Sequence, residues 1–137
     1  KLNIKKLDYN QSVDGAESEL SRINIYVFDF KSEFIKNNFK FQQKNIFRLT
    51  QLSELNTNLE KDPESIIIFY YNSNPKVTNQ LCLQIRTKFS KTKSLIVAKN
   101  LSADKDSKHK KTNFRADNYL SYPFTELDFK KCIEELN

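Results

Sequence analysis

The chain has 137 residues, which is enough for one domain with a buried core, and its formal net charge is +6. An aromatic content of 12% argues against a disordered chain, and the single Gly excludes the Gly-rich loops with which many proteins bind phosphates. The excess of Lys leaves several purposes open: plain solubility, or binding to an acidic protein, to nucleic acid or to an anionic membrane surface.

Cysteine and histidine are rare and scattered in this sequence. Cys82 and Cys132 lie far apart in apolar helical patterns, so we expect two buried, reduced thiols in a cytoplasmic protein. His109 has no cysteine or second histidine near it, and we expect no metal site and no cofactor. No apolar run is long enough to cross a bilayer, and we expect neither membrane insertion nor a leader peptide.

Residues 1–22 differ from the rest of the chain, because their apolar residues are weakly periodic and they contain the only glycine, Gly15. This composition predicts a linker or the tail of a preceding domain. We expect the folded domain to cover residues 23–137.

Five segments rich in β-branched and aromatic residues predict β-strands. In chain order they cover residues 23–29, 45–50, 65–71, 94–98 and 119–122. The third is the most apolar run of the chain, ends at Tyr71 and is closed by Asn-Ser-Asn-Pro. An uninterrupted run of this kind is typical of a strand buried on both faces, so we expect the sheet to be built around it.

Helical segments separate these strands. We expect them to begin near Ser32, Ser53, Pro75, Ser102 and Thr125. The segment after Pro75 is the clearest amphipathic helix, and Thr125 with Asp128 resembles a capping box. Strands and helices that alternate at this spacing predict a parallel sheet with right-handed crossovers. The expected fold is α/β and flavodoxin-like, with five strands in the order 2-1-3-4-5 and helices on both faces.

One predicted helix lacks the apolar face that would hold it on the sheet. In residues 102–115 only Ala103 and Phe114 are apolar, and most of the other side chains are charged or polar. Because helices in proteins are stabilised mainly by packing of an apolar face, we predict that this fourth helix is short, loosely packed or partly irregular.

The sequence Arg-Ala-Asp-Asn-Tyr-Leu-Ser-Tyr-Pro-Phe, residues 115–124, resembles the signature near the end of response-regulator receiver domains, usually Gly-Ala-Asp-Asp-Tyr-Leu-x-Lys-Pro-Phe. It stands before the last predicted helix, as it does in that family, and the resemblance extends over residues 23–137. The resemblance implies a receiver fold and a place in bacterial two-component signal transduction. Receivers take a phosphoryl group from a histidine kinase onto an aspartate.

The resemblance also implies where the phosphorylation site would lie. The phosphoacceptor position is Tyr71, the acid pair that helps to hold Mg²⁺ falls on Asp29 and Phe30, the hydroxyl position is Ala98 and the lysine position is Tyr122. A phenol does not replace a carboxylate as acceptor and is a poor Mg²⁺ ligand at neutral pH. We therefore expect a pseudo-receiver, with the fold but without aspartyl phosphorylation or catalysis.

Several residues around this degenerate site have more than one interpretation. Lys99 follows the fourth strand and is hypothesised to contact Asp29 in place of the cation, the alternative being two solvated charges. Tyr71 and Tyr122 either fill the volume of the lost site or form a rigid surface for a partner. Tyr119 keeps the aromatic residue that often reports the switch in receivers.

A Lys-rich segment is the second candidate for function, because in receivers the surface from the fourth to the fifth helix engages partners. Its candidate residues are Lys105, Lys108, Lys110, Lys111, Phe114, Arg115 and Tyr119. Three interpretations of this segment are open: a solvated loop, a binding site for an acidic protein, or a binding site for nucleic acid or an anionic ligand. We expect a phosphorylation-independent protein–protein interaction module that binds another protein or a linked domain of the same chain. The alternative is a basic module that binds nucleic acid or an anionic nucleotide signal.

Overall fold

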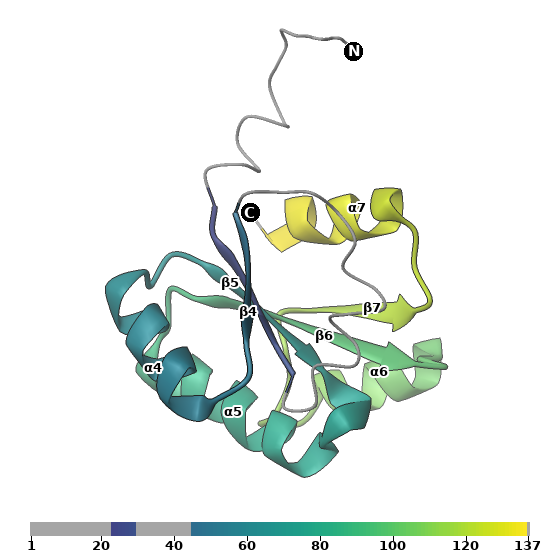
Figure 1. Ribbon diagram of the computed structural model, residues 1–137. Coiled ribbons are helices and arrows are strands. Elements are labelled where there is room, and N and C mark those ends of the chain that lie inside the picture. Colours follow the sequence, from purple (N-terminus) through teal and green to yellow (C-terminus); the bar gives the residue numbers. More distant parts are fainter. Residues whose placement is uncertain (1–22, 30–44, 137) are drawn as a thin grey trace, which may run out of the picture.

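The computed structural model describes residues 23–29 and 45–136, which form one parallel sheet with helices on both faces (Figure 1). Three predictions lie outside the described residues. They concern the tail 1–22, the helix expected to begin near Ser32, and the position of Phe30.

The five strands of the sheet are ordered β4-β3-β5-β6-β7, and every neighbouring pair is parallel. In chain order they are β3 (Ile25–Phe28), β4 (Ile46–Leu49), β5 (Ile66–Tyr70), β6 (Lys93–Lys99) and β7 (Asn118–Tyr122). Counted along the chain, this order is 2-1-3-4-5. The predicted flavodoxin-like α/β fold is therefore confirmed.

β5 is the central strand, as its apolar sequence predicts. It pairs with β3 on one side and with β6 on the other, and its residues Ile66 to Phe69 are at most 1% exposed. The strand ends at Tyr70, one residue earlier than predicted, and the chain then turns through the short 3-10 helix η1 (Tyr71–Ser73). Tyr71 thus belongs to the loop at the carboxyl end of the sheet.

Two long helices cover one face of the sheet and a third covers the other (Figure 1). α4 (Leu52–Lys61) and α5 (Pro75–Lys88) lie on the first face, and α7 (Glu126–Leu136) lies on the second. The predicted capping box of α7 is confirmed, because Thr125 and Asp128 exchange two hydrogen bonds of 3.1 Å.

Each face of the sheet has its own apolar cluster. Phe69 and Leu55 belong to the cluster beside α4 and α5, whereas Phe129 belongs to the cluster beside α7. Cys82 lies in the first cluster and Cys132 in the second, so the sheet separates them. Both are buried and free, as predicted.

α6 (Ala103–Lys110) is a short but regular helix, and residues 111–114 after it form turns and a bend, so the prediction of a short, loosely packed or partly irregular segment is confirmed. Local interactions explain its regularity. The Ser102 hydroxyl accepts a hydrogen bond of 3.2 Å from the Lys105 N–H. Two ion pairs of 3.3 Å join residues one turn apart: Lys108–Asp104, which is exposed, and Lys110–Asp106, whose carboxylate is partly buried. No residue of α6 is buried.

Candidate functional site

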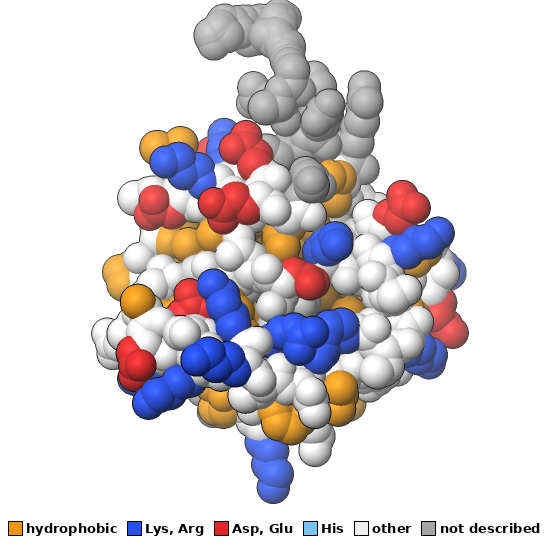
Figure 2. Space-filling view, turned by 180° about the vertical axis from the view of Figure 1, so that it is seen from behind, with side chains coloured by type: hydrophobic (Ala, Val, Ile, Leu, Met, Phe, Trp, Pro, Cys, Tyr) orange, Lys and Arg blue, Asp and Glu red, His pale blue; other side chains and the backbone are white. Residues whose placement is uncertain are grey.

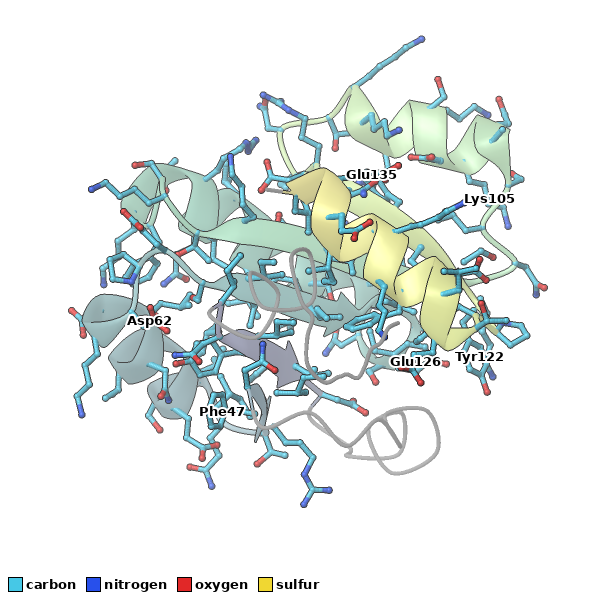
Figure 3. The ribbon with its side chains drawn as sticks, turned by 90° about the horizontal axis from the view of Figure 1, so that it is seen from above. Phe47, Asp62, Lys105, Tyr122, Glu126 and Glu135 are labelled. Atoms are coloured by element: carbon cyan, nitrogen blue, oxygen red, sulfur yellow. The ribbon has the colours of Figure 1, made fainter. Side chains whose placement is uncertain are left out.

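The carboxyl ends of the parallel strands meet at one edge of the sheet, which is where open α/β folds bind their ligands. Asp29 follows β3, Tyr71 follows β5, and Lys99 and Tyr122 are register partners at the ends of β6 and β7. Figure 3 shows Tyr122 on the same side of the molecule as Lys105 of α6. The fold therefore brings the described residues of the predicted site to one edge.

Asp29 is buried at this edge, with 1% of its surface exposed. Its Oδ1 accepts a hydrogen bond of 2.6 Å from the Ser73 hydroxyl, and its backbone N–H donates to Leu49 O at 3.1 Å. Ser73 was not among the predicted site residues, although it is the one hydroxyl in the polar turn that closes β5. The buried acid at this edge thus accepts a hydrogen bond from a neutral donor of the chain.

Lys99 does not occupy the place of a cation beside Asp29. Its backbone N–H donates to Asn72 Oδ1 at 2.8 Å, and its Nζ lies 6.0 Å from the centroid of the Tyr122 ring. Within the described ranges, the expected ion pair of Lys99 with Asp29 is not found. The ammonium group instead lies over an aromatic face, which attracts cations.

Tyr71 and Tyr122 point to opposite faces of the sheet. Tyr71 packs against the cluster beside α4 and α5, to which Ala98 also belongs, whereas Tyr122 packs against the cluster beside α7. The Tyr122 ring meets Tyr70 edge to face, with centroids 6.4 Å apart. The structure therefore does not bring Tyr71 and Tyr122 together into one surface.

A chain of polar contacts fastens α6 to β7 and α5. The Ala116 N–H donates to the Tyr119 hydroxyl oxygen at 3.0 Å, and that oxygen lies 2.5 Å from His109 Nδ1. His109 Nε2 lies 2.8 Å from Asn79 Oδ1, and the Asn79 side-chain amide donates to the Tyr71 hydroxyl at 3.4 Å. All these groups are satisfied when Tyr119 donates to Nδ1 and Nε2–H donates to Asn79, which is the neutral form of His109.

The acid–base properties of the two rings agree with this arrangement. Burial lowers the pKa of His109, although the nearby Asp106 carboxylate opposes the shift. Burial also raises the pKa of Tyr119 to about 12. At neutral pH the imidazole and the phenol are therefore both uncharged. His109 was predicted only to lack metal-binding neighbours, and its role as the anchor of α6 was missed.

A pocket of about 420 Å³ opens between α6 and the carboxyl ends of β5 and β6. Ala98 and Leu101 are part of its apolar lining, and Lys105 and Lys108 approach it from α6. It therefore adjoins Tyr71 on the side of the sheet that α5 covers.

The predicted interaction face is exposed except for one residue. We define the basic surface as its exposed members: Lys105, Lys108, Lys110, Lys111, Phe114 and Arg115. Tyr119 is only 8% exposed, so its assignment to this face is wrong; its hydroxyl is bonded inward to Ala116 and His109. Figure 2, seen from behind Figure 1, shows Lys and Arg side chains gathered in the lower half of the molecule with acidic side chains among them.

The part of the chain that the structure describes holds no group of three or more His, Cys, Asp or Glu side chains suited to a metal ion. Each helix there is too short or too polar to span a bilayer.

Comparison with protein-family models and with curated proteins finds no match for the chain. The resemblance to receivers stays a prediction.

Proposed function

We propose that the chain is a pseudo-receiver, which acts as a phosphorylation-independent protein–protein interaction module of a regulatory protein and has no catalytic role. The observation that carries the proposal is the composition of the sheet edge. Tyr71 stands at the phosphoacceptor position, and the buried Asp29 accepts a hydrogen bond of 2.6 Å from Ser73. With Ala98 and Tyr122 at the hydroxyl and lysine positions, the charge of a phosphoryl group would have no support.

The basic surface favours a protein partner of acidic character, or an acidic linked domain of the same chain. Phe114 is 39% exposed, and Lys111 and Arg115 beside it are exposed as well. Aromatic and arginine side chains are frequent anchors of protein interfaces. Complementary charge across such an interface raises the association rate and the selectivity for the partner.

The loss of phosphorylation is tested by incubating the protein with acetyl phosphate and Mg²⁺ and measuring its intact mass. We expect no added phosphoryl group, whereas a receiver that keeps its aspartate gains one under the same conditions. Stable modification that maps to Asp29 would overturn the proposal.

The interaction surface is tested with a photo-crosslinking residue in the full-length protein. One variant carries it at Phe114, and a matched control carries it at Leu83 on α5, because the two side chains are 39% and 37% exposed. We expect an acidic protein or a linked domain to crosslink at position 114 and not at 83, and Arg115→Glu to weaken this crosslink. Equal crosslinking at both positions, or none at 114, contradicts the proposal.

A basic module that binds nucleic acid is the second candidate, because Phe114 is an exposed ring next to cations, as single-strand binding requires. Gel-shift measurements with single-stranded RNA and DNA separate the two candidates. Binding at low salt that weakens steeply as salt is added favours nucleic acid. Absence of binding at low salt excludes it.

A further inference from the structure

The pocket beside α6 exists because α6 buries no apolar side chain that would fill it. No residue of α6 is buried, and the helix is attached through the His109 ring. The sheet beneath nevertheless presents Ile96 and Ala98, which belong to the apolar cluster of that face. A helix that stands off an apolar floor leaves atoms without packing partners, and a ligand can restore those contacts.

The size and the rings of the pocket suit a small molecule with a flat ring. Its volume of about 420 Å³ falls within the range of small-molecule pockets, roughly 300–1,000 Å³. His109 stands edge to face with Tyr71 and with Tyr119, at centroid distances of 5.6 and 5.4 Å. Ala98 and Leu101 add an apolar lining. A planar ligand can continue such packing, because aromatic rings prefer edge-to-face and offset contacts.

The charged side chains that line the pocket select for an anion. They are Lys105 and Lys108 of α6, and among the described lining residues there is no Asp or Glu. Lys99 also lines the pocket, but its ammonium lies over the Tyr122 ring, which packs on the other face of the sheet. Lys108 pairs with Asp104 at 3.3 Å, but both side chains are more than three-quarters exposed, so this pair holds the ammonium weakly. An anionic group at the mouth of the pocket would gain attraction from these lysines without displacing a strong internal partner.

We propose that this pocket binds a small organic anion, whose ring lies against Ala98 and Leu101 and whose phosphate or carboxylate reaches Lys105 and Lys108. A nucleoside monophosphate and an aromatic carboxylate share this chemistry. The proposal is independent of the function proposed above. The domain can bind this anion without a protein partner, and it can bind a protein partner without this anion.

The first test uses two fluorescent probes that differ in charge. Anilinonaphthalene sulfonate carries a flat ring system and an anionic group, and N-phenyl-1-naphthylamine has the same rings without the charge. We expect the sulfonate to bind at one saturable site, about tenfold more tightly than the neutral probe. In the ¹⁵N-labelled protein, the sulfonate should shift the amide signals of Ala98, Leu101 and His109. Equal affinity for both probes, or shifts confined to other regions, overturns the proposal.

The second test removes the charge near the pocket. The double variant Lys105→Gln/Lys108→Gln should bind the sulfonate about tenfold more weakly, since each exposed charge contributes modestly. The matched control Lys91→Gln/Lys93→Gln removes the same charge from exposed sites at the opposite end of β6, and it should change the affinity less than about twofold. An equal loss in both double variants means that net charge alone attracts the probe, which contradicts the proposal.

The third test fills the pocket and identifies the anion. Ala98→Phe should abolish binding of both probes, and unchanged binding contradicts the proposal. If this variant does not fold, the amide shifts of the unsubstituted protein decide. Adenosine monophosphate and indole-3-acetate then compete with the bound sulfonate. Displacement of the sulfonate by adenosine monophosphate indicates a phosphate ligand, and displacement by indole-3-acetate indicates a carboxylate ligand. If neither compound displaces the sulfonate, the proposal of an organic-anion site is overturned.

Discussion

The Tyr119 hydroxyl oxygen lies 2.5 Å from His109 Nδ1, and this contact joins α6 to the last strand of the sheet. The other ring nitrogen, Nε2, lies 2.8 Å from Asn79 Oδ1 on α5. One imidazole thus connects three elements, where a typical surface helix would use a row of apolar side chains.

Replacing His109 by Ala should loosen α6 while the sheet stays intact. The change removes the partner of the Tyr119 hydroxyl and of Asn79, and leaving such groups unpaired costs about 1–3 kcal/mol. We expect a free energy of unfolding lower by about that amount, and faster amide hydrogen exchange in α6 than in α5. Lys108→Ala, an exposed neighbour on α6, is the control and should change neither quantity much.

Protonation of His109 should destabilise the fold in mild acid. Burial lowers its pKa, so as the pH falls below about 6.5 the unfolded chain takes up the proton before the folded chain does. The stability that the neutral ring provides is therefore complete above about pH 6.5 and is lost as the pH falls towards the lowered pKa. Urea unfolding across this range measures the loss. The His109→Ala variant should show a weaker pH dependence, and an unchanged dependence would assign the effect to other groups.

Ser73→Ala should destabilise the protein by removing a donor from a buried carboxylate. Asp29 is 1% exposed, and its carboxylate accepts a hydrogen bond of 2.6 Å from the Ser73 hydroxyl. Loss of a hydrogen bond to a buried polar group costs about 1–3 kcal/mol. Chemical denaturation gives this difference directly. Ser90→Ala, at an exposed position, is the matched control. Equal stability of the two variants would mean that the hydroxyl adds nothing to the buried acid.

Neither thiol should react in the folded protein near neutral pH. Burial raises the pKa of Cys82 to about 12 and that of Cys132 to about 11, so little thiolate is present. We expect a chromogenic disulfide reagent to label both cysteines only after denaturation. In native protein any slow labelling should reach Cys132 first, because it is 8% exposed and Cys82 is 1% exposed. Rapid labelling of Cys82 in the native state would show that the cluster beside α5 opens readily.

The sheet could be predicted from the sequence because its signals are local. The apolar run before Tyr71 predicts a central strand, and the alternation of strands with helical segments predicts parallel pairing and its order. The Thr125–Asp128 cap could be predicted for the same reason, since its two residues are three positions apart.

The contacts that define the candidate site could not be predicted in this way, because they join residues far apart in the chain. Ser73 and Asp29 are 44 positions apart, and His109 and Asn79 are 30 apart. Such pairs depend on which strands become neighbours and on where each strand ends. A one-residue difference at the end of β5 moved Tyr71 from the strand into η1. The attachment of α6 through one imidazole could not be predicted either, because it leaves no periodic pattern of apolar residues in the sequence.

The inward hydroxyl of Tyr119 has a consequence for how the domain is used. If the ring turned outward, the Ala116 N–H and His109 Nδ1 would lose their partner, at a cost of about 1–3 kcal/mol for each group. Fewer than about one molecule in thirty would then hold the outward rotamer. A domain with so strong a preference has one resting geometry. We expect the basic surface to be presented whenever the chain is folded, so that cellular abundance, and not covalent modification, would govern its output.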